Sequence, residues 1–66
     1  MEVKDMNKAE LLNQLRASGQ INDVGDTQNV LWQRAFDLYK QRGNVVDMGC
    51  SSCWSKVKEW LENEND

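Results

Sequence analysis

The sequence contains no histidine and no proline, and only two of its 66 residues are cysteine. Without histidine, the chain lacks the commonest general base and the commonest metal ligand near neutral pH. No run approaches the roughly 18 consecutive apolar residues of a membrane span, and residues 1–5 lack an apolar signal-peptide core. We therefore expect a cytoplasmic protein without membrane association, whose cysteines are reduced by default.

What the sequence does contain points to one small folded domain over residues 1–66. Hydrophobic residues make up 39% of the chain, three of them are tryptophans, and the net charge is -3. A domain of this length buries only about 60% of the surface of its unfolded chain, so its core is thin and gains from a partner. Because so short a chain has little room to enclose a substrate, we expect neither catalytic residues nor a cofactor.

Apolar periodicity predicts a first helix over about residues 6–17. Asp5 is a suitable N-cap, and Gly19 can end the helix in the left-handed conformation. In the connector 20–27, Ile21 and Val24 are expected to insert into the core. The helix has an apolar stripe that consists of Met6, Ala9, Leu11, Leu12 and Leu15.

The second predicted helix, about 28–42, has the widest apolar face and should be the centre of the fold, with Asp26 or Thr27 as its N-cap. A third helix is predicted over about 52–63, and the acidic end of the chain, 62–66, should be frayed. The second helix presents two apolar rows, which are Leu31, Ala35 and Leu38, and Trp32, Phe36 and Tyr39.

The pair Cys50 and Cys53 forms a C-x-x-C motif at the start of the third helix. A helix start lowers the pKa of a thiol, as thiol–disulfide oxidoreductases require, but no strand precedes Cys50 here. A structural zinc site needs about four ligands, so only two chains together could build one from this motif. The simplest interpretation is that both cysteines are small buried apolar residues.

The tryptophans on the third helix cannot both face the core, because six positions correspond to about 240° around a helix. Trp60 shares a row with Cys53 and Val57, so Trp54 is predicted to be partly exposed. Trp54, with Lys58, is therefore the candidate partner-binding residue.

Basic residues concentrate in the middle of the chain, although the chain as a whole is acidic. Between residues 27 and 58 there are five basic residues and only two acidic ones, Asp37 and Asp47. Such a cluster can contact phosphates, although no stripe or stacking motif of a known nucleic-acid binder is present. The candidate phosphate contacts are Arg34, Lys40, Arg42, Lys56 and Lys58.

A resemblance to other proteins rests on three features, which are residues 32–44, the Cys50-Ser51-Ser52-Cys53 motif and a last helix that ends in Trp60-Leu61. This pattern resembles a loose group of small uncharacterised proteins encoded by phages and mobile elements of Bacteroidetes-type bacteria. The resemblance covers about residues 31–61, roughly half of the chain. It implies no activity, but it implies a viral product in the host cytoplasm or the virion, either a virion component or a binder of a host factor.

The sequence thus predicts an all-α, three-helix domain with the second helix central. The favoured function is a non-enzymatic protein–protein interaction module that binds a partner or self-associates. Two alternatives stay open. One is a small nucleic-acid-binding or transcription-modulating protein, and the other is a dimer that uses Cys50 and Cys53 for thiol redox chemistry or shared zinc.

Overall fold

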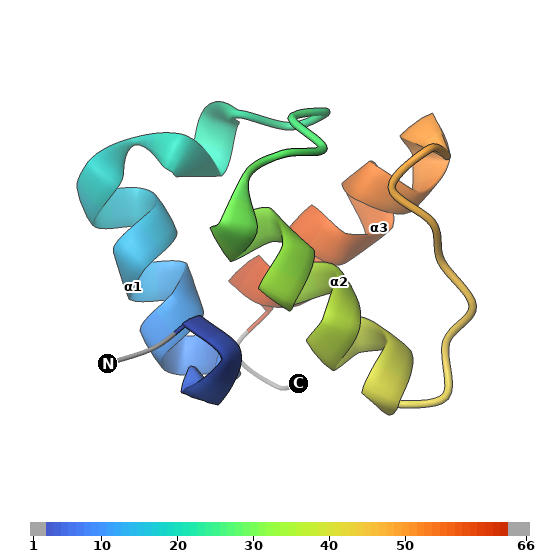
Figure 1. Cartoon of the computed structure of the whole chain (residues 1–66), viewed down its shortest axis with the longest axis horizontal. Coiled ribbons are helices and arrows are strands. Elements are labelled where there is room, and N and C mark those ends of the chain that lie inside the picture. Colours follow the sequence, from blue (N-terminus) through green and yellow to red (C-terminus); the bar gives the residue numbers. More distant parts are fainter. Residues whose placement is uncertain (1–2, 64–66) are drawn as a thin grey trace.

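The computed structural model describes residues 3–63, and this part of the chain contains three α-helices and no strand (Figure 1). The all-α, three-helix prediction is therefore confirmed. The helices are α1 (Lys8–Ser18), α2 (Val30–Gln41) and α3 (Ser51–Glu62), and two 3₁₀ turns are η1 (Val3–Asp5) and η2 (Gln20–Asn22). Each helix begins and ends within two residues of its predicted range. The acidic end was expected to be frayed over 62–66, and residues 64–66 of it lie outside the described residues.

The start of α1 differs from the prediction. Asn7, not Asp5, is the N-cap, and its side chain accepts a hydrogen bond from the Glu10 backbone N–H at 2.9 Å. Asp5 lies in η1, where the Met6 N–H donates to the Val3 carbonyl at 3.1 Å and closes a separate turn before the helix. The predicted end of α1 is confirmed, because Gly19 has a φ of 78° and occupies the left-handed region that glycine adopts without strain.

The start of α2 also lies later than predicted. Asn29 is the N-cap, with its Oδ1 accepting from the N–H groups of Leu31 and Trp32. Asp26 instead stabilises a turn, since its carboxylate accepts from the Gln28 N–H at 3.1 Å. Consecutive turns carry the chain to Asn29 before the helical bonds begin, so neither Asp26 nor Thr27 caps the helix.

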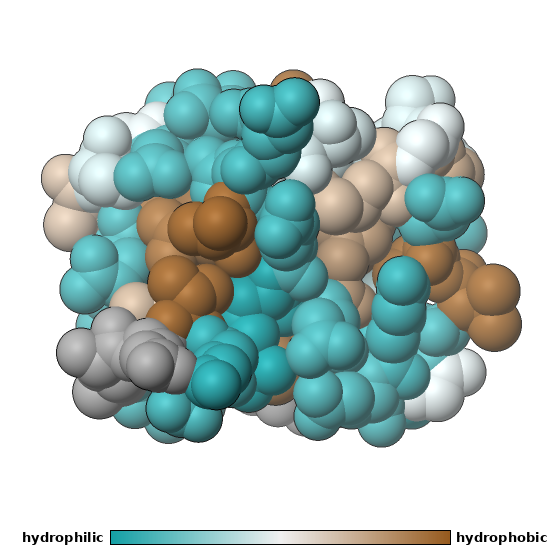
Figure 2. All heavy atoms as spheres, viewed as in Figure 1, coloured by the Kyte–Doolittle hydropathy of each residue, from teal (hydrophilic) through white to brown (hydrophobic). Residues whose placement is uncertain are grey.

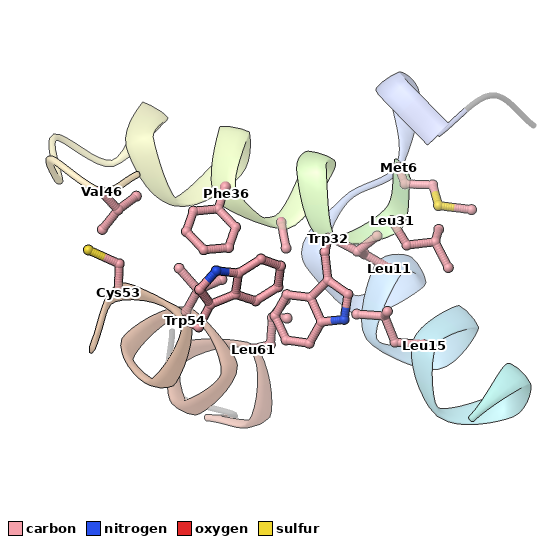
Figure 3. Close-up of a cluster of buried hydrophobic side chains, with 12 residues drawn as sticks. Met6, Leu11, Leu15, Leu31, Trp32, Phe36, Val46, Cys53, Trp54 and Leu61 are labelled. Carbon is pink, nitrogen blue, oxygen red and sulfur yellow. The ribbon is translucent and has the colours of Figure 1, made fainter. Parts of the chain in front are cut away.

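The core is a single cluster to which all three helices contribute. Helix α2 contacts α1, α3 and η1, and Figure 3 shows its side chains meeting those of the other helices. The Trp54 ring lies 5.1 Å from that of Trp32, tilted to it, and 4.8 Å from that of Phe36 in an edge-to-face arrangement, which aromatic pairs prefer. The buried residues are Met6, Leu11, Leu15, Leu31, Trp32, Ala35, Phe36, Val46, Cys53, Trp54, Val57 and Leu61.

Two buried indoles also hold the chain between the helices. The Trp32 Nε1–H donates to the Gln20 carbonyl at 3.0 Å, and the Trp54 Nε1–H donates to the Met48 carbonyl at 2.7 Å. In the first connector, Ile21 packs against the core as predicted. Val24 is 44% exposed, so its predicted insertion is wrong: it lies in a turn that faces solvent. Across residues 3–63, no helix has the length and apolar character needed to cross a membrane.

Candidate functional site

The partly exposed tryptophan of α3 is Trp60, not Trp54. Trp54 is only 3% exposed, so it offers almost no surface to a partner and its predicted role as a contact residue is wrong. At about 100° per residue, Val57 and Leu61 lie about 40° apart and define the buried face of α3. Trp54 lies only about 20° beyond Leu61, whereas Trp60 lies about 60° beyond Val57 on the other side. Trp60 therefore shares a row with Cys53 and Val57, as expected, but lies at the edge of the core.

Residues of α1 and α2, and the residue that follows α2, surround the half-buried Trp60 ring of α3. The ring of Tyr39, from α2, lies 5.3 Å away at an interplanar angle of 56°. The Lys8 Nζ, at the start of α1, lies 4.9 Å from the ring centroid, and the Arg42 guanidinium, just after α2, lies at 5.9 Å. Both distances fall within the roughly 6 Å range of cation–π attraction.

Two adjoining hollows extend from this cluster, and we call them together the Trp60 groove. They share Lys8 as a lining residue and have volumes of about 390 Å³ and 280 Å³. Within residues 3–63, the charged groups that line the two hollows are three cations and one carboxylate, of which Arg16 and Glu62 form an ion pair at 3.9 Å. The groove is lined by Lys8, Ala9, Leu12, Arg16, Leu38, Gln41, Arg42, Trp60, Leu61, Glu62 and Asn63.

The predicted phosphate contacts do not gather around one hollow. Arg34 is mostly buried: its Nε donates to the Met6 carbonyl at 3.1 Å and its Nη1 pairs with Asp37 at 2.9 Å. Lys58 lines a hollow that borders the larger hollow of the Trp60 groove at Glu62 and Asn63, whereas Arg42 lines the smaller hollow beside Trp60. Lys40 and Lys56 are exposed and line none of these hollows.

Apolar surface is also found away from the groove. Figure 2 shows one apolar patch between α1 and the start of α2 and another over the loop after α2. Val30, at the start of α2, is 57% exposed and borders a hollow together with Val3. In the loop, Val45 is 98% exposed.

The two cysteines have different environments. Cys53 is buried in the core, whereas Cys50 is half-exposed and is the N-cap residue of α3. The expectation that both are buried is therefore wrong for Cys50, which packs against the edge of the core and is only partly buried at the N-cap. Hydrogen bonds to the Cys50 sulfur, first from the Cys53 thiol and then from Ser52, lower its pKa from 9.0 to about 7. Within residues 3–63, no cluster of three or more His, Cys, Asp or Glu side chains could hold a metal ion.

No known protein family, curated protein or solved structure matches the chain. The resemblance to phage proteins therefore stays a prediction, and the function has to be argued from the residues of this chain. Sequence reasoning missed the roles of Lys8 and Arg16, since contacts between helices decide which cations lie beside Trp60. The exposure of Trp60 itself could have been found from the helical angles of α3.

Proposed function

We propose that the chain is a non-enzymatic protein-interaction module whose Trp60 groove binds an acidic segment of a partner protein. The observation that carries this proposal is the half-buried pair of Trp60 and Tyr39 with Lys8 and Arg42 beside the Trp60 ring. Tryptophan, tyrosine and arginine are the residues most enriched among those that dominate binding energy at protein interfaces.

The preference for an acidic segment follows from the charges of the groove. Among the described lining residues, the cations Lys8, Arg16 and Arg42 outnumber the one carboxylate, that of Glu62, although the whole chain has a net charge of -3. Such local excess steers a ligand of opposite charge and disfavours one of the same charge. The leucines that line the groove can receive apolar side chains of the same segment. The ligand is thus a peptide that carries both acidic and apolar residues.

Nucleic-acid binding receives less support from the arrangement of cations. Arg34 is already bonded to the Met6 carbonyl and to Asp37, and Lys58 and Arg42 line different hollows. A phosphate backbone is bound by cations that follow one continuous track. The proposal does not depend on a viral origin, and a host protein or a virion protein could supply the acidic segment.

The three indole N–H groups provide a direct test by two-dimensional NMR. Those of Trp32 and Trp54 are bonded to backbone carbonyls in the core, so the Trp60 signal reports on the groove separately. We expect a synthetic peptide of alternating glutamate and leucine to shift the Trp60 signal and leave the other two nearly unchanged. The same peptide with lysine for glutamate should have no such effect. Equal shifts with the lysine peptide or with a single-stranded oligonucleotide would contradict the proposal.

Charge reversal supplies a matched pair of variants. The double change Lys8→Glu and Arg42→Glu should weaken binding of the acidic peptide at least about tenfold, because like charges placed opposite each other are strongly unfavourable. Lys40→Glu with Lys56→Glu makes the same change in net charge at exposed sites away from the groove and should change affinity little. Circular dichroism checks that both variants stay helical, and equal weakening in the two would show a non-specific charge effect.

A further inference from the structure

The N-cap of α3 is occupied by a residue that caps poorly. Helices α1 and α2 both begin after an asparagine whose side chain accepts hydrogen bonds from the first-turn amides. Cys50 occupies the same position in α3 and makes no such bond. Serine, threonine, aspartate and asparagine are the residues that stabilise this position. A cysteine at this position therefore adds little to the stability of α3, so any role of Cys50 lies in the chemistry of its sulfur.

The surroundings of Cys50 favour its thiolate. Its sulfur lies 3.2 Å from the Ser52 hydroxyl and also interacts with the Cys53 thiol. These hydrogen bonds bring the pKa to about 7, so about half of the Cys50 groups are thiolate near neutral pH. Thiolate is the form that attacks disulfides, and Cys50 is accessible to small molecules.

Cys53 is placed to react with Cys50 in turn. The Cys53 N–H donates to the Cys50 carbonyl at 3.1 Å, which holds the two residues one turn apart. Side chains at this spacing have Cβ atoms about 5–6 Å apart, and a disulfide needs about 3.5–4.5 Å. Cys50 is the N-cap residue, and its N–H donates to the Asp47 carbonyl of the preceding turn at 3.0 Å, so disulfide formation requires a small movement of this turn. Figure 3 shows Cys53 beside Val46, on the side of α3 that this loop covers.

We propose that Cys50 and Cys53 form a reversible oxidation site that reacts with small-molecule disulfides. The Cys50 thiolate attacks one sulfur of the disulfide, a new S–S bond forms, and the first thiolate leaves and takes a proton from solvent. Cys53 then loses its proton to solvent and attacks the Cys50 sulfur, which releases the second small thiol. The protein loses two electrons and two protons, and the small disulfide takes up two of each to become two thiols.

Oxidised glutathione and intact-mass measurement test this order of events. The wild-type protein should lose two hydrogens and keep no adduct. The Cys53→Ser variant should keep one glutathionyl group on Cys50, because no second thiol can displace it. The Cys50→Ser variant should stay unmodified over the same time, since only the buried thiol remains. Cys53→Ala provides a second form of the resolving variant that avoids a hydroxyl in the core.

The pH dependence of alkylation gives an independent measurement. In the Cys53→Ala variant, the hydrogen bond from Cys53 is absent, so the midpoint of iodoacetamide reactivity should lie above that of Cys50 in the wild-type protein, which we expect near pH 7. The same protein unfolded in urea should react with a midpoint near the ordinary thiol value. A wild-type midpoint equal to that in urea would overturn the proposal. Accumulation of a stable glutathione adduct or of a disulfide-linked dimer in place of the internal disulfide would overturn it too.

Discussion

The two irregular connectors of the molecule, residues 19–29 and 42–50, are each held by the indole of a buried tryptophan. In the first, Trp32 donates to the Gln20 carbonyl, and in the second, Trp54 donates to the Met48 carbonyl. The two bonds have the same chemistry, but their surroundings differ. Comparison of the connectors shows a difference in how many further hydrogen bonds surround each indole bond.

The first connector has several anchors around one residue. The Gln20 carbonyl also accepts from the Asp23 N–H at 2.9 Å, and the Gln20 side chain accepts from the Asn29 amide at 2.8 Å. In the second connector, the Asn44 amide donates to the Tyr39 carbonyl near its start, and the Trp54 indole is the one bond to the Met48 carbonyl among the described residues. The second connector also carries the exposed Val45 and leads to Cys50. The segment with fewer anchors therefore carries the reactive residue, as expected for regions that open locally.

Removal of either indole should have the largest effect on stability. Trp32→Ala and Trp54→Ala each leave a cavity in the single core, and such changes reduce the free energy of unfolding by about 3–5 kcal/mol. In so small a domain, this amounts to much or all of the stability. Urea unfolding followed by circular dichroism measures the effect, with Trp60→Ala as a control of equal volume. If Trp60→Ala destabilised as strongly as the core variants, the burial pattern of α3 would be contradicted.

Replacement of each indole by phenylalanine sharpens the comparison of the connectors. Both changes keep an aromatic ring and remove the N–H donor. Trp54→Phe leaves the Met48 carbonyl without its protein donor, an effect of about 1–3 kcal/mol, whereas after Trp32→Phe the Gln20 carbonyl keeps its bond from Asp23. We therefore expect Trp54→Phe to destabilise more, and hydrogen exchange to speed up in residues 44–50 more than in residues 19–29. The reverse order would show that the second connector has other anchors.

Substitutions at the N-caps of α2 and α3 should have the smallest effects on stability, with opposite signs. Asn29→Ala removes the bonds to two amides of α2 and should destabilise by about 1 kcal/mol. Cys50→Ser introduces a better cap at α3 and should raise the urea midpoint. Urea unfolding of the two variants, which are changed at equivalent positions, should therefore show shifts of the midpoint in opposite directions. A lower midpoint for Cys50→Ser would show that the cysteine itself stabilises the fold.

The sequence predicted the three helices and the central position of α2 because their apolar rows are long and regular. It did not predict the caps Asn7 and Asn29, because several polar residues precede each helix and only the three-dimensional turns decide among them. Whether Trp54 or Trp60 is the more exposed depends on where the centre of the buried face of α3 lies. Leu61 is buried together with Val57, which shifts this centre toward Trp54 and leaves Trp60 at the edge. The Trp60 groove could not be predicted, since Lys8, Arg42 and Trp60 are distant in sequence and meet only when the helices pack.

The two indole bonds span short stretches of chain, from residue 32 to 20 and from residue 54 to 48. Closing a segment of this size takes on the order of 10–100 ns, far less than the assembly of a whole domain. Each tryptophan can therefore find its carbonyl soon after the neighbouring helix forms, and the chain, which has no proline, has no prolyl isomerisation to slow it. Refolding should accordingly be fast and follow a single exponential, as in other small helical proteins whose contacts are local.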